Sequence, residues 1–126
     1  MGFNLQVVKT NDFVRFDGHG KLDLEQSRRA LERLATACVT SGANCALLDV
    51  RDMRTELGLV DFYNLISAFH AMGFRHNHHL AVLHRYNGGD KAEFFALCAS
   101  SRGWNVRAFD EFEHAVEWFE SSCEVK

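Results

Sequence analysis

The sequence contains no proline and no Gly/Ser-rich stretch among its 126 residues. Linkers between domains are typically rich in these residues, so their absence predicts a single domain over residues 1–126. No apolar run approaches the roughly 18 residues that a transmembrane helix needs, which excludes stable membrane insertion. Residues 1–5 lack the basic segment and apolar run of a signal peptide, and we therefore expect a cytoplasmic protein.

An excess of basic charge is also missing, because the formal net charge is −3 and the pI is about 6.1. Domains that bind nucleic acid usually carry a basic surface, so we expect no nucleic-acid partner. Acidic residues outnumber basic ones between Asp110 and Lys126. We interpret this segment as the solvated face of a helix, and a docking surface for a basic partner is the alternative.

The sequence shows no pattern typical of a cofactor or metal site. Its four cysteines form no C-x-x-C pair, and without a secretion signal we expect reduced thiols. His76, His78 and His79 are close in sequence, but an intervening strand would place His84 about 15 Å from His79 at roughly 3.3 Å per residue. We therefore predict no metal ligands and no cofactor.

Motifs for catalysis are absent as well. The sequence has no G-x-S-x-G nucleophile elbow, and its glycine pair Gly88-Gly89 matches neither the Walker pattern nor G-x-G-x-x-G. No spacing of carboxylates singles out a pair for acid–base chemistry. We predict no catalytic residues and a protein that is not an enzyme.

Hydrophobic periodicity predicts secondary-structure elements in the order ββαβαβαβα. The expected strands cover residues 5–8, 13–16, 45–50, 80–83 and 104–109, and the expected helices begin near Asp23, Asp61, Asp90 and Asp110. The turn signal Asn11-Asp12 joins the first two strands into a hairpin. Because the later strands alternate with helices, we expect an α/β fold with a mixed, mainly parallel sheet and about four covering helices.

Charged residues are dense between Asp49 and Glu56, immediately after the expected central strand. The carboxyl ends of parallel strands are where open α/β sheets bind ligands and partners. We therefore predict a regulatory or partner-binding surface here, and a solvated loop of weak ion pairs is the alternative. The candidate partner-binding residues are Asp52, Arg54, Thr55 and Glu56.

Aromatic residues are abundant, with 11 Phe, 2 Trp and 2 Tyr. This excess leads to a second hypothesis, in which a small apolar ligand binds beside a helix predicted over residues 59–72. Phe62, Phe69 and Phe74 would face the ligand, and simple core packing is the alternative. Tyr63 or Trp118, if exposed, would form the centre of a homodimer interface.

Three stretches carry a family pattern, namely residues 47–53, 79–83 and 94–119. They resemble the small bacterial STAS-like proteins, which are relatives of the domain shared by anti-sigma factor antagonists and sulphate transporters. The resemblance implies a sheet with helices on its faces, an N-terminal strand or hairpin, and a non-enzymatic regulatory role that depends on protein interaction. Some members are described as related to lipid-transfer CRAL-TRIO domains, which favours the ligand hypothesis.

The family's phosphorylation site does not carry over to this sequence. Anti-sigma factor antagonists have a phosphorylatable serine in an Asp-Ser-Ser-Gly-like segment after the central strand. The matching residues 52–58 contain no serine, and Thr55 is the nearest hydroxyl. The resemblance therefore implies partner binding without a matching phosphosite.

Overall fold

The computed structural model describes residues 7–9, 13–85 and 90–122. In this part of the chain, one sheet has the strand order β1-β2-β3-β4-β5. The strands are β1 Val7–Lys9, β2 Val14–Leu22, β3 Cys45–Thr55, β4 His79–Leu83 and β5 Asn105–Phe109. β1 pairs antiparallel with β2, whereas β2 to β5 are parallel, and this confirms the predicted α/β class. The expected turn at Asn11-Asp12 lies outside the described residues, so the connected hairpin stays a prediction.

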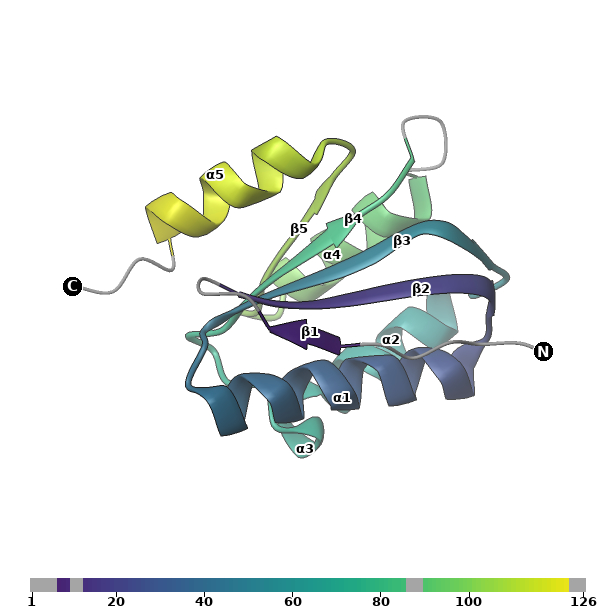
Figure 1. The fold of residues 1–126 in the computed structure, drawn as a ribbon. Coiled ribbons are helices and arrows are strands. Elements are labelled where there is room, and N and C mark those ends of the chain that lie inside the picture. The colour runs from purple at the N-terminus through teal and green to yellow at the C-terminus, as the bar shows by residue number, and fades with distance from the viewer. Residues whose placement is uncertain (1–6, 10–12, 86–89, 123–126) are drawn as a thin grey trace.

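The helices of the described part cover both faces of the sheet unequally. They are α1 Leu24–Ser41, α2 Leu59–Ser67, α3 Phe69–Met72, α4 Asp90–Ser100 and α5 Phe112–Ser122. Figure 1 shows α1 to α4 on one face and α5 on the other. Successive parallel strands are neighbours, so right-handed crossovers place their connecting helices on the same face. None of these helices is long and apolar enough to cross a membrane.

Helix ends largely follow the capping signals of the sequence. The Asp23 carboxylate accepts a 2.8 Å hydrogen bond from the backbone N–H of Gln26 at the start of α1. Asp61 accepts a 3.0 Å bond from the Gly58 N–H at the start of α2. The single helix expected over residues 59–72 is interrupted at Ala68 and becomes α2 and α3. This break accounts for five helices in place of the expected four.

Strands β3 and β4 contribute alternate side chains to two apolar cores, because successive residues of a strand point to opposite faces. Phe16, Leu48 and Val82 lie in the larger core under α1 to α4. Leu47, Leu83 and Phe119 lie in the smaller core under α5. The two-sided burial of β4 and of residues 45–48 of β3 explains why these stretches are almost wholly apolar.

The predicted loop after residue 50 is wrong, because β3 continues to Thr55 and β2 continues to Leu22 beside it. Asp17 pairs with Asp49 and His19 with Asp52, so two residues of β3 oppose Gly18 alone. This β-bulge shifts the alternation of apolar and polar residues, and the strand signal is lost from the sequence. A Cβ atom at Gly18 would lie 2.5 Å from the Met53 sulphur, so a larger residue here would require the flexible side chain of Met53 to move.

The cysteines differ from the expectation that all are reduced. Cys45 is disulfide-bonded, whereas Cys38 and Cys98 are free thiols. Cys38 is buried on α1, and this burial raises the pKa of its thiol to about 11. Cys123 lies outside the described residues.

Candidate functional site

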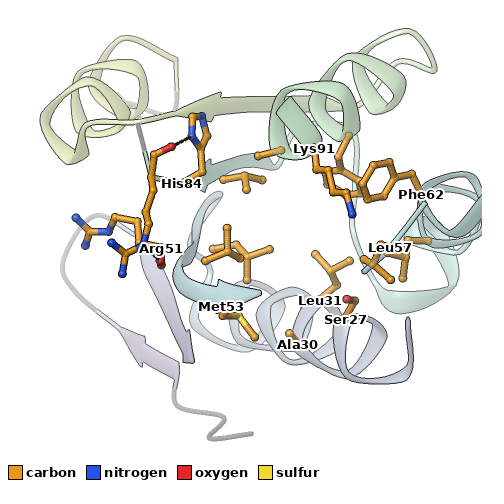
Figure 2. Close-up of a pocket in the computed structure, with 16 residues that line it drawn as sticks. Ser27, Ala30, Leu31, Arg51, Met53, Leu57, Phe62, His84 and Lys91 are labelled. Atoms are coloured by element: carbon orange, nitrogen blue, oxygen red, sulfur yellow. Dashed lines mark hydrogen bonds between the residues drawn. The ribbon is translucent and has the colours of Figure 1, made fainter. Parts of the chain in front are cut away.

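An apolar pocket of about 150 Å³ lies between α1, α2 and α4, over β3 and β4 (Figure 2). Helices α1 and α2 supply apolar side chains to its walls, and β3, β4 and α4 supply the remainder. The apolar lining residues are Ala30, Leu31, Leu48, Val50, Met53, Leu57, Phe62, Leu65, Val82, Ala92 and Phe95. The pocket is therefore an opening into the larger core.

Short side chains leave room for this pocket. Ser27 and Ala30 on α1 and Ala92 on α4 stand among leucine and phenylalanine side chains. The hydroxyl of Ser27 donates a 2.7 Å hydrogen bond to the carbonyl of Asp23, so its polar group is satisfied within its own helix. Sequence analysis missed these residues because small residues on a buried helix face are typical of ordinary packing.

Four basic residues are among those that line the pocket. Arg51, His84, Arg85 and Lys91 line it, and no acidic residue is among the described residues that do so. In Figure 2 the ammonium group of Lys91 points toward the space between the labelled side chains. Arg85 pairs with the carboxylate of Asp52 at 3.1 Å. Arg51 and His84 lie on the opposite side of the pocket from Lys91 and Phe62 in Figure 2, and the guanidinium of Arg51 binds the carboxylate of Asp49.

His84 borders the pocket from the end of β4. Its side chain is buried, and its backbone N–H donates a 2.9 Å hydrogen bond to the carbonyl of Phe109. The ring Nδ1 lies 2.7 Å from the carbonyl oxygen of Arg85. The other ring nitrogen has no hydrogen-bond partner in the described structure, and the Glu93 carboxylate lies 4.0 Å from it.

The three phenylalanines predicted to face a ligand take different positions. Phe62 is 5% exposed and lines the pocket. Phe69 and Phe74 are not among its lining residues and pack against each other in the core, with ring centroids 5.1 Å apart. Phe69 also contacts Trp104 edge to face, with a centroid distance of 5.3 Å. The structure therefore brings only Phe62 of these three to the pocket.

A network of charges lies on β2 and β3 around the buried carboxylate of Asp49. Arg15 and Arg51 each place a guanidinium nitrogen 2.8 Å from one oxygen of this carboxylate. Burial alone would raise the pKa of Asp49, but hydrogen bonds from Arg51 and Arg15 outweigh it and lower the pKa. Arg15 also pairs with Asp17 at 2.6 Å. The network ties the two strands together next to the bulge.

The four predicted partner-binding residues follow this network at the end of β3. Asp52, Arg54 and Glu56 are exposed, and Glu56 forms a 3.4 Å ion pair with Lys21. Thr55 is the last residue of β3 and pairs with Leu22 through the backbone. Asp52 and Arg54 are two residues apart on β3, so their side chains point to the same face of the sheet, and Glu56 follows the end of the strand. They lead directly to the start of α2.

Exposed apolar side chains gather on α2 and α4. Val60 is 71% exposed and Leu97 is 65% exposed. We call this region the α2–α4 surface, defined by Leu59, Val60, Tyr63, Phe94 and Leu97. A second pocket is lined by Leu59, Val60 and Tyr63 of this surface together with Ile66, Cys98 and Arg102. The guanidinium of Arg102 lies 4.4 Å from the centroid of the Tyr63 ring.

Sequence analysis identified only Tyr63 of the α2–α4 surface. The i, i+3 spacing of Phe94 and Leu97 in the sequence predicts that both face the core, but Phe95, Ala96 and Ala99 are buried instead. The helix is apolar on more than one side, so periodicity could not tell which side faces the core. Trp118, the other predicted interface residue, is half-buried against His79 with a centroid distance of 5.2 Å.

The clustered histidines have separate structural roles. His76 stacks on Trp104 with a centroid distance of 4.0 Å, and His78 accepts a 3.0 Å hydrogen bond from the backbone N–H of Arg75. Burial lowers the pKa of both His78 and His79. Among the described residues, no three His, Cys, Asp or Glu side chains form a group that could hold a metal ion.

Solved structures with similar folds come from bacterial regulators and their relatives. An uncharacterised protein from Shewanella loihica with a SpoIIAA-like fold is 20% identical, with a TM-score of 0.56 over 94% of each chain. An anti-sigma factor antagonist from Mycobacterium paratuberculosis is 15% identical, with a TM-score of 0.62 over 94% of this chain and 95% of the other. Unphosphorylated SpoIIAA, also an anti-sigma factor antagonist, is 15% identical, with a TM-score of 0.52 over 92% and 94%.

These similarities establish the fold. No family model matches the sequence, and no curated protein matches it either. The chain has a SpoIIAA-like (STAS) fold, which confirms the resemblance noted in residues 47–53, 79–83 and 94–119.

Proposed function

We propose that this chain is a non-enzymatic regulatory domain of a bacterial cytoplasm that binds a partner protein through the α2–α4 surface. One observation carries the proposal, which is the gathering of large exposed apolar side chains on two adjacent helices. Contiguous apolar patches on a protein surface commonly mark interaction sites. The anti-sigma factor antagonists with the same fold support a regulatory role over a catalytic one.

The energetics of this surface favour association. Full burial of a valine, leucine or phenylalanine side chain contributes about 1.5–3 kcal/mol. Burial of several such side chains is enough to offset the roughly 4–15 kcal/mol that association costs in lost freedom. Tyr63 and Arg102 belong to the residue types that most often dominate binding energy at interfaces.

The charged residues predicted from the sequence border this surface in the proposal. Arg54 lies near the end of β3 and Glu56 lies in the short segment between β3 and α2, and we place both at the rim of a complex centred on Val60. Charges at the rim of an interface mainly select the partner and accelerate the encounter. We therefore assign affinity to the apolar side chains and selectivity to Arg54 and Glu56.

Affinity capture with matched variants tests this function. Val60→Glu places a charge in the centre of the α2–α4 surface. Val39→Glu is the matched control, because it makes the same substitution at another exposed valine, which lies on α1 and is 49% exposed. A partner retained by the wild type and by Val39→Glu, but lost by Val60→Glu, supports the proposal. A partner retained equally by all three proteins contradicts the assignment of the surface.

A second function, binding of a small apolar ligand, is favoured by the pocket beside α2. Its volume of about 150 Å³ and its apolar walls provide a binding site for such a molecule. Native mass spectrometry of the purified protein, repeated under denaturing conditions, tests it. A mass that is lost on denaturation supports the function, and failure of every apolar probe to bind the purified protein contradicts it.

A further inference from the structure

We infer that the pocket between α1, α2 and α4 binds a neutral, wholly apolar molecule with a single ring of about six carbons. The inference rests on the second proposed function, and it adds the size and the polarity of the ligand. Three observations carry it, namely the volume of the pocket, the apolar character of its interior and the partners that its polar lining residues already have.

The volume of the pocket limits the ligand to about one ring. An engineered protein cavity of about 150 Å³ with leucine, isoleucine and phenylalanine walls binds benzene. The pocket described here has about the same volume, 150 Å³, and similar walls. Sites for drug-sized molecules are larger, at about 300–1,000 Å³. A molecule with two rings or a long chain would therefore leave part of its apolar surface in water.

Two alanines determine this size limit. Ala30 on α1 is 1% exposed, Ala92 on α4 is half-buried, and both line the pocket among larger side chains such as Leu31 and Phe95. A leucine or phenylalanine at either position would occupy space that the ligand needs. The ring size that the pocket accepts thus depends on residues from two helices that are distant in sequence.

The interior of the pocket offers apolar contacts and few hydrogen-bonding groups. Leu31, Leu57 and Phe62 line it, and the hydroxyl of Ser27 donates its hydrogen bond to the carbonyl of Asp23. Water inside would lack the two to four polar partners that typically hold a buried water molecule. An apolar group that displaces such weakly held water gains affinity.

Both arginines of the lining are engaged with carboxylates. Arg51 donates to the two oxygens of Asp49, at 3.0 Å from Nε and at 2.8 Å from a terminal nitrogen. Arg85 pairs with Asp52 at 3.1 Å and donates from Nε to the backbone carbonyl of Arg51. A charged ligand would compete with these partners, whereas a neutral apolar ligand leaves them in place.

The remaining basic residues of the lining do not favour a charged ligand either. Nδ1 of His84 lies 2.7 Å from the carbonyl oxygen of Arg85, and in Figure 2 its ring is directed away from the labelled apolar side chains. Lys91 makes an interaction of its own. A charged head group would therefore lose hydration on entry without gaining a partner in return, which costs free energy.

The experiment is an NMR titration of the methyl groups of the full chain with three probes. Toluene is the neutral single-ring probe, benzoate is its charged match, and naphthalene is the neutral two-ring probe. We expect toluene to shift the methyl signals of Leu31, Leu57 and Val82 in a saturable manner, and to leave those of Leu47 and Leu83, in the core under α5, unchanged. Benzoate and naphthalene should each bind about ten-fold more weakly than toluene, because of desolvation and of overpacking respectively.

Each contrary result overturns a defined statement. If benzoate binds as tightly as toluene, the ligand is not neutral and the inference fails, although the second proposed function stands. If naphthalene binds as tightly as toluene, the size limit is wrong, and the pocket still binds apolar molecules. If none of these probes shifts the methyl signals of the pocket, the second proposed function itself fails.

A pocket-filling variant locates the binding. Ala92→Phe adds a ring to a half-buried position of the pocket wall, and Ala37→Phe adds the same ring to a half-buried position of α1 that does not line the pocket. Toluene binding that is lost in Ala92→Phe and kept in Ala37→Phe supports the inference. Toluene binding that persists in a folded Ala92→Phe protein places the site elsewhere and overturns it.

Discussion

Phe62 and Tyr63 are consecutive residues of α2 and face different surroundings. Phe62 is 5% exposed, lines the pocket and contacts Phe95 with a ring-centroid distance of 5.5 Å. Tyr63 is 56% exposed and lies beneath the guanidinium of Arg102. One helix therefore forms a wall of the pocket with one face and part of the α2–α4 surface with another. Substitutions on α2 can change either region separately.

The first prediction concerns stability at these two positions. Phe62→Ala removes a buried ring and should lower the free energy of unfolding by about 3–5 kcal/mol. Tyr63→Ala removes an exposed ring and should lower it by less than about 1 kcal/mol. Urea unfolding followed by circular dichroism measures both values. Equal losses at the two positions would contradict the different burial of these neighbours.

The second prediction concerns the charges at the rim of the α2–α4 surface. Charge reversal by Arg54→Glu or Glu56→Arg should weaken binding of the partner, mainly through a slower association rate. Both side chains are exposed, so the free energy of unfolding should change by no more than about 0.5 kcal/mol. Surface plasmon resonance with the captured partner measures the rates. Arg33→Glu on the exposed side of α1 is the control, and an affinity unchanged by either rim reversal would remove these residues from the site.

The fold could largely be predicted from the sequence, because its signals are local. Apolar runs such as Cys45–Val50 identified the central strands, and Asp23 with Gln26 identified the start of α1. The extension of β3 to Thr55 could not be predicted, because it depends on pairing with β2 across a bulge. The bulge shifts the alternation of apolar and polar residues, so this part of β3 shows no regular period in the sequence.

The candidate sites were less accessible to prediction. Phe62 lines the apolar pocket, and its place in a clear helical stripe is what singled it out in the sequence. The other lining residues come from α1, β3, β4 and α4, and only the folded chain brings them together. Phe94 and Leu97 were expected to be buried, because α4 is apolar on more than one side. Which side becomes exposed depends on how α4 packs against α2.

The third prediction concerns the carboxylate of Asp49. Asp49→Asn removes a charge that binds both Arg15 and Arg51, and should lower the free energy of unfolding by about 1–3 kcal/mol at neutral pH. The pKa of Asp49 is lowered in the folded state, so its stabilising contribution is present above the unfolded value of about 3.9 and is lost as the pH falls below it.

Urea unfolding at about pH 5 and about pH 3 checks this linkage, since the unfolded-state pKa lies between these values. The wild type should lose more stability over this interval than Asp49→Asn does. Asp110→Asn, on an exposed aspartate outside the network, should behave like the wild type. An identical loss in all three proteins would show that Asp49 does not supply the acid sensitivity.

The fourth prediction concerns thiol reactivity. Cys38 is buried and its thiol has a pKa of about 11, so it stays protonated and shielded at neutral pH. Cys98 is only half-buried. Iodoacetamide should therefore modify Cys98 before Cys38 in the native protein, and peptide mass spectrometry distinguishes the two sites. Modification of Cys38 at the rate seen in urea would contradict its burial.

The central claim is that the α2–α4 surface binds a partner protein, and site-specific photo-crosslinking tests it most directly. A photoreactive phenylalanine analogue replaces Val60 on the surface, or Val39 on α1 as the control, in cells that produce the chain. The account predicts one discrete crosslinked product from position 60, which is heavier than the chain by the mass of a single partner protein. It predicts no crosslinked product from position 39. The same crosslinked products from both positions, or none from position 60 with a folded protein, would contradict it.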